Sequence, residues 1–170
     1  MDKIDKSDIF LSVVKSNKGI IYKVANSYCK NVEDRKDLVQ EIIIQLWKSF
    51  DNYDDNFKHS TWIYRISLNV AISFYRKENT RKEISNSLTT DIFDFTDTEI
   101  SDEKETNLGL LTQIISKLND LDKALVLLYL EEKNYKEISE IIGITETNIA
   151  TKIGRIKNKL KKEFYQLKTQ

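Results

Sequence analysis

Proline is absent from this chain of 170 residues, and glycine occurs at only four widely spaced positions. Proline breaks helices because it lacks a backbone N–H and clashes with the preceding turn, and the tight turns of β-hairpins depend on glycine. Helices can therefore run uninterrupted along this chain, whereas a sheet of hairpins would lack its turn residues. We predict an all-α protein.

The chemistry open to the chain is limited by its single cysteine, Cys29, and its single histidine, His59. One cysteine cannot form an internal disulfide, which is typical of a reducing compartment. Cysteine–histidine metal clusters and glycine-rich phosphate loops need residues that this chain does not bring together. The N-terminal sequence MDKIDKSDIF lacks a signal-peptide core, and no stretch reaches the roughly 18 apolar residues of a membrane span. We therefore expect a cytoplasmic protein with no metal, no cofactor, no membrane insertion and no enzymatic activity.

Helical periodicity divides the chain into two blocks, 7–82 and 107–168. The segment between them, 83–106, has poor periodicity and many carboxylates against the single basic residue Lys104. Net charge is zero, with 27 basic and 27 acidic residues, so the distribution of charge matters more than its sum. We predict two small helical domains joined by a flexible acidic linker.

In the first block, Asn31 can cap a helix from Val32 to about Phe50, and Ser60 or Thr61 can cap a second long helix. The first helix has an inward apolar stripe, Leu38, Ile42, Leu46 and Phe50. Its other side is polar but includes an isoleucine, which suggests a protein contact. The alternative is an ordinary exposed isoleucine, which is common on protein surfaces. The residues of this face are Asp37, Gln40, Glu41 and Ile44.

The second long helix carries one stripe of aromatic, guanidinium and amide groups: Trp62, Arg65, Asn69, Ser73 and Arg76. Such a face suits single-stranded bases, through stacking and hydrogen bonds. The alternative is a buried tryptophan with salt-bridged arginines.

In the second block we expect helices from about Asn107 to Leu118 and from about Leu121 to Glu132, followed by a helix-turn-helix. Its short helix begins with a capping box at Asn134 and Glu137 and ends at Gly143, and Thr145 caps a last helix through about Phe164. The last helix has an apolar stripe, Ile149, Ile153, Ile156, Leu160 and Phe164.

The opposite side of the last helix is polar and basic, as expected for contacts to base edges and phosphates. The candidates near bases are Thr147, Asn148, Thr151, Lys152 and Arg155, and the phosphate candidates are Lys157, Lys159, Lys161 and Lys162. The alternative is a solvated lysine face.

The run DLVQEIIIQLW, with its polar loop and TWIYRISLNVAISFYRK, resembles region 2 of bacterial RNA polymerase sigma factors. The run from LNDLDKALVLLYLEEKNYKEISEIIG to IKNKLKKEF is similar to their region 4. Two such regions with a short linker resemble the extracytoplasmic-function (ECF) group of the sigma-70 family. The resemblance implies a transcription initiation factor with region 2 at 7–82, a linker at 83–106 and region 4 at 107–168.

The resemblance also implies roles for the candidate residues. The DLVQE face would bind the β′ clamp helices of the polymerase core through Asp37, Gln40, Glu41 and Ile44. Region 2 would bind the melted minus-ten element through Phe57, Lys58, His59, Trp62, Arg65, Asn69 and Arg76. Region 4 would read duplex minus-thirty-five DNA near the β flap, through Thr147, Asn148, Thr151, Lys152, Arg155 and Lys157. An anti-sigma factor or another recruiting protein would regulate the chain in trans.

Three other interpretations of the residues compete with this one. A conventional helix-turn-helix regulator would bind duplex DNA unaided, usually as a dimer on a two-fold site. A protein-only adaptor would make no DNA contact. An RNA-binding protein would use the aromatic-basic stripe but leave the helix-turn-helix unexplained.

Overall fold

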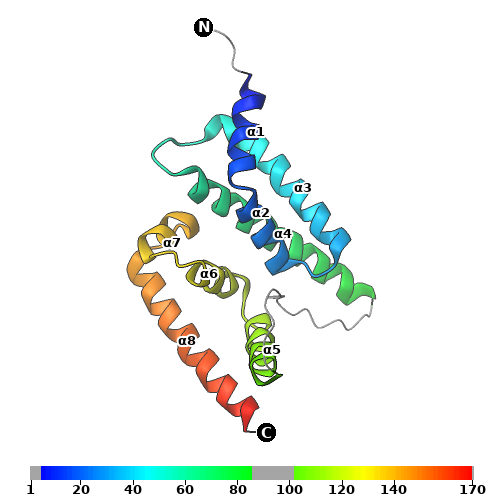
Figure 1. Ribbon diagram of the computed structural model, residues 1–170, viewed down its shortest axis with the longest axis vertical. Helices are drawn as coiled ribbons and strands as arrows, with labels where there is room; N and C mark the ends of the chain where they lie inside the picture. The colour runs from blue at the N-terminus through cyan, green and yellow to red at the C-terminus, as the bar shows by residue number, and fades with distance from the viewer. Residues whose placement is uncertain (1–4, 86–101, 170) are drawn as a thin grey trace. The chain divides into compact units, whose positions relative to one another are not determined.

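The computed structural model describes residues 5–85 and 102–169, and all of the regular structure in these ranges is helical (Figure 1). The all-α prediction is confirmed. Helices α1–α4 belong to one compact unit and α5–α8 to a second. The first unit contains α1 (Lys6–Ser16), α2 (Lys18–Tyr28), α3 (Val32–Ser49), the 3₁₀ helix η1 (Phe50–Asn52) and α4 (His59–Ser85). The second contains α5 (Asp102–Ser116), α6 (Asp120–Leu130), α7 (Tyr135–Ile142) and α8 (Glu146–Lys168).

The first unit is built on α4, which packs against both α2 and α3. Leu38, Ile42 and Leu46 are fully buried, as their spacing of four residues along α3 predicts. Asn31 caps α3 as expected, because its side-chain oxygen accepts hydrogen bonds from the backbone N–H groups of Glu33 and Asp34. The buried stripe directs the polar stripe of α3 away from this hydrophobic core.

Helix α4 begins earlier than its expected caps, Ser60 and Thr61, which both lie inside the helix. The carbonyl of Lys58 accepts the N–H of Trp62 at 3.2 Å and so closes the first turn. The ends of the predicted linker are also helical, since α4 continues to Ser85 and α5 begins at Asp102. The rest of that linker, residues 86–101, lies outside the described residues.

The second unit is built around α8, which packs against α5, α6 and α7. The predicted capping box is present, with reciprocal bonds between Asn134 and Glu137. Gly143 has a φ of 82° and ends α7 in the left-handed conformation, and Thr145 caps α8 by accepting the N–H of Asn148. The helix-turn-helix therefore forms as predicted, and α8 extends beyond Phe164 to Lys168.

Two glycines of this unit allow a paired test of stability. Gly143→Ala should destabilise the unit by about 1–2 kcal/mol, because an L-residue is strained at this positive φ. Gly154→Ala should stabilise it by about 0.5–1 kcal/mol, because Gly154 is exposed within α8. Neither added methyl group meets an atom within 4 Å, so both effects are conformational. Urea unfolding followed by circular dichroism measures both, and changes of the same sign would contradict the prediction.

Candidate protein and nucleic-acid interfaces

The candidate protein-binding face of α3 is open to solvent. Asp37 and Gln40 are exposed, Glu41 is partly exposed, and the Ile44 side chain remains 45% exposed. Glu41 is oriented by Gln45, whose amide donates to its carboxylate at 2.9 Å. The stripe thus presents acidic groups around an exposed apolar side chain, a combination suited to a protein partner.

A groove of about 780 Å³ separates this face from α4. Its α3 wall includes Asp37 and Glu41, and its α4 wall includes Asn69 together with the basic residues Lys77 and Arg81. Two candidate protein-binding residues, Asp37 and Glu41, and two residues of the candidate DNA stripe, Asn69 and Ser73, therefore line the same groove. Each wall also carries one charge of the other sign, Lys48 on the α3 wall and Glu78 on the α4 wall, so the α3 wall is net acidic and the α4 wall net basic. This difference favours a binding partner whose own charges are arranged in the complementary order.

The loop before α4, residues 53–58, is held by Tyr53. The Tyr53 ring stacks on His59 with ring centroids 4.6 Å apart and planes 17° apart, and its hydroxyl donates to the carbonyl of Phe57. Burial and the carboxylates of Asp55 and Asp54 raise the pKa of Tyr53, so the hydroxyl keeps its proton and its donor role. In this loop Lys58 is exposed and Phe57 is partly exposed, and His59 at the start of α4 is partly exposed as well.

The predicted exposure of Trp62 is wrong. Its side chain is only 9% exposed, because its ring packs against Phe50 at 6.0 Å and against Tyr53 at 5.3 Å. The alternative of a buried tryptophan therefore holds for this residue, and Trp62 supports the loop from beneath.

The remaining stripe on α4 stays accessible. Asn69, Ser73 and Arg76 are exposed, and Arg65 is partly exposed, with its guanidinium 5.1 Å from the centre of the Phe57 ring. The structure thus brings Arg65 and Phe57 together beside the loop. A guanidinium against an aromatic ring leaves a flat surface of the kind on which bases stack.

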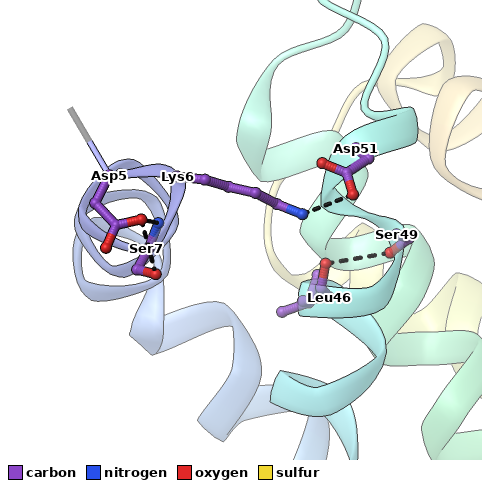
Figure 2. Close-up of polar contacts among 6 residues, drawn as sticks. All are labelled: Asp5, Lys6, Ser7, Leu46, Ser49 and Asp51. Carbon is purple, nitrogen blue, oxygen red and sulfur yellow. Dashed lines mark hydrogen bonds and ion pairs between the residues drawn. The ribbon is translucent and has the colours of Figure 1, made fainter. Parts of the chain in front are cut away.

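Sequence reasoning missed the contribution of α1 and of Tyr53. Lys6 extends from α1 to Asp51 in η1, with Nζ and Oδ2 2.6 Å apart (Figure 2). Phe10 of α1 is buried against Trp47 and Phe50. These contacts join residues about forty positions apart, so no helical periodicity could have indicated them, although the density of aromatic residues around the loop was a visible signal.

The candidate base-reading face of α8 is exposed where the helix begins. Thr147, Asn148, Thr151 and Arg155 are exposed and Lys152 is partly exposed, while Ile149, Ile153 and Ile156 are buried on the other side. The Thr151 hydroxyl donates to the carbonyl of Thr147 at 3.0 Å. The two faces therefore separate as predicted from Ile149 to Ile156, whereas Leu160 and Phe164, the last two residues of the predicted apolar stripe, are only partly buried.

Lys157 lies apart from this group. Its ammonium donates to the Tyr129 hydroxyl at 2.7 Å and sits 4.2 Å from the centre of the same ring. This hydrogen bond raises the pKa of Lys157. Lys157 also lines a small apolar pocket formed by α5, α6 and α8. It therefore connects α8 to α6, on a flank of α8 away from Thr151 and Arg155.

Two further findings concern other kinds of site. Across residues 5–85 and 102–169, no helix has both the length and the hydrophobicity that a membrane crossing requires. Within the same ranges, no three histidine, cysteine, aspartate or glutamate residues are grouped as a metal site would need.

Both units of the chain match models of known protein families. The family model for sigma-70 region 2 matches residues 13–81, and the model for sigma-70 region 4 matches residues 108–160. The ECF RNA polymerase sigma factor SigM of Bacillus subtilis is 30% identical over 142 residues, covering 83% of this chain and 86% of SigM. SigW of the same organism is 29% identical over 170 residues, covering 94% of this chain and 91% of SigW.

The helical fold and these matches define a transcription initiation factor rather than an enzyme. The chain belongs to the ECF group of RNA polymerase sigma factors, within the sigma-70 family. As a sigma factor it binds RNA polymerase core and directs promoter-specific initiation of transcription. The all-α, two-domain prediction and the family resemblance are both confirmed.

Solved structures share this fold at low sequence identity. One is the sigma factor RpoE in complex with the anti-sigma factor NepR from Bartonella quintana, with a TM-score of 0.65 and 16% identity over 94% of this chain and 96% of RpoE. Another is CnrH in complex with the cytosolic domain of CnrY, with a TM-score of 0.64 and 18% identity over 92% of this chain and 87% of CnrH.

The different surroundings of Lys157 and Arg155 lead to a prediction about DNA binding. Arg155→Gln should reduce the salt dependence of duplex binding by about one unit of slope, or lose affinity mainly for the preferred sequence. Lys157→Gln should leave the slope unchanged, because its ammonium is engaged by Tyr129. Fluorescence anisotropy over a range of salt concentrations measures both slopes. An equal decrease for both variants would mean that Lys157 also contacts phosphate.

Proposed function

We propose that the sigma-factor activity is divided among three surfaces. The exposed α3 face, Asp37, Gln40, Glu41 and Ile44, binds the clamp helices of the polymerase β′ subunit. The loop before α4 and the accessible α4 stripe bind the melted minus-ten strand, and the start of α8 reads the minus-thirty-five duplex. The observation that carries this proposal is the separation of each polar surface from a buried apolar stripe on the same helix.

In the minus-ten surface, the groups that reach the strand are Phe57, Lys58, His59, Arg65, Asn69 and Arg76. Their mixture of rings, cations and an amide suits stacked, unpaired bases and their phosphates. Trp62 acts beneath this surface, through its ring contacts with Tyr53 and Phe50. Its contribution is support for the loop rather than stacking on DNA.

In the minus-thirty-five surface, we assign near-base contacts to Thr147, Asn148, Thr151, Lys152 and Arg155. A helix-turn-helix presents the first turns of its second helix to the major groove, and these residues occupy the first turns of α8. Lys157 instead fixes α8 against α6. The apolar surface of the same unit faces the β flap.

We propose the domain boundaries 7–82 for region 2, 83–106 for the linker and 107–168 for region 4. An anti-sigma factor or another recruiting protein regulates the chain by covering its polymerase-binding faces. The related fold of RpoE, which was solved with the anti-sigma factor NepR, supports this mode of control. Since its partner enzyme transcribes chromosomal DNA, the chain acts in the cytoplasm.

Transcription with purified core polymerase tests the overall proposal. Core from the same organism, sheared genomic DNA and this protein should yield transcripts with discrete 5′ ends, and sequencing those ends defines the promoters used. Core alone is the control. A conventional helix-turn-helix regulator would bind duplex DNA without core but add no new starts, and that result would remove the initiation role.

The polymerase-binding face has its own test. Asp37→Lys combined with Glu41→Lys should abolish detectable core binding, because juxtaposed like charges cost several kcal/mol at an interface. Circular dichroism should show an unchanged helical fold, since Asp37 is exposed and Glu41 partly so. Asp8→Lys, an exposed acid on α1, is the control and should bind normally. Biolayer interferometry with immobilised core makes the comparison, and unchanged affinity of the double variant would place the interface elsewhere.

A further inference from the structure

The N-terminal helix α1 contacts the end of α3 through a buried aromatic side chain. The Phe10 ring, 4% exposed, lies edge-on to Trp47 at 5.0 Å and to Phe50 at 5.3 Å. Edge-to-face pairs at these separations are favourable and orient the rings they join. Phe10 therefore fixes the place where α3 passes into η1.

From Phe50 the ring contacts continue to the loop. Phe50 lies 6.0 Å from Trp62 of α4, and Trp62 lies 5.3 Å from Tyr53 in the loop. Tyr53 in turn stacks on His59 and donates its hydroxyl to the Phe57 carbonyl. A continuous series of ring contacts thus leads from α1 to the loop backbone.

A polar contact reinforces the same junction. The Lys6 ammonium is 2.6 Å from the Asp51 carboxylate in η1 (Figure 2). It also lies 4.7 Å from the centre of the Trp47 ring. Tyr53 directly follows η1, and its N–H donates to the Phe50 carbonyl at 3.2 Å. Holding Asp51 therefore also holds the start of the loop.

We propose that Phe10 and Lys6 are positioning residues for the loop of residues 53–58, acting through the junction of α3 and η1. The effect of this positioning on DNA rests on the proposed function, in which the loop binds the melted strand. A loop held in one conformation binds one strand sequence in preference to others. Neither residue touches the strand. Loss of either loosens Phe50, Trp62 and Tyr53 in turn, while the polymerase-binding face of α3 keeps its structure.

Hydrogen exchange of the full-length protein tests the structural part of this proposal. Phe10→Leu keeps an apolar side chain but removes both ring pairs, so exchange of the amides of residues 54–58 should accelerate about three- to ten-fold. Amides in the middle of α3 and in α5–α8 should be unchanged. Val13→Ala removes buried volume from α1 outside the ring contacts and is the control. Equal acceleration in both variants, or none in Phe10→Leu, would overturn the proposal.

A charge exchange tests the functional part. Lys6→Glu and Asp51→Lys should each lower the sequence preference of the holoenzyme about two- to five-fold. This preference is the ratio of its affinity for one DNA single strand to its affinity for a scrambled strand of the same composition. The strand is a 12-nucleotide oligonucleotide from a promoter mapped by the transcription experiment. The double variant restores the opposite charges and should restore the preference. A ratio that is the same in all four proteins would overturn the role of Lys6.

The two experiments separate this proposal from the proposed function. If Phe10→Leu accelerates loop exchange but the wild-type holoenzyme binds no strand, the positioning role stands and the DNA-binding role of the loop fails. If the wild-type holoenzyme prefers the strand and Lys6→Glu and Asp51→Lys leave that preference unchanged, the positioning role of Lys6 fails and the DNA-binding role stands.

Discussion

Burial of one apolar stripe on α3 and of another on α8 is the constraint on which both units depend. In α3, Leu38, Ile42 and Leu46 are completely buried, and in α8, Ile149 is completely buried with Ile153 and Ile156 nearly so. Because side chains four residues apart share one face of a helix, burying these stripes determines the direction of every other residue on the same helix. Asp37 and Arg155 are exposed because of that geometry. Their own side chains need make no contact to hold them at the surface. The exposed polar faces proposed as interfaces are thus consequences of the hydrophobic core.

Local sequence signals predicted the helices and their caps well, because each signal acts within a few residues. Asn31, the pair Asn134 and Glu137, Gly143 and Thr145 all have the expected roles. The boundaries of α4 and α5 were less well predicted. Lys58 closes the first turn of α4 with its backbone carbonyl, and no side-chain signal marks such a start.

The sites were harder to predict than the fold where contacts join distant parts of the chain. Helical periodicity places Trp62 beside Arg65, but it does not reveal that Phe50 and Tyr53 cover the indole ring. The same limit applies to Lys157, which a count of basic residues assigns to DNA and whose hydrogen bond to Tyr129 that count does not reveal. Residue type and spacing define a face, and only tertiary contacts decide which side chains on it are available.

The lack of proline has a consequence for the time that the protein needs to become active. Isomerisation at prolyl bonds takes tens of seconds at room temperature and often limits refolding, whereas helices form within microseconds. A newly synthesised copy of this chain has no such slow step. Prolyl isomerisation therefore adds no delay between its translation and its first encounter with polymerase.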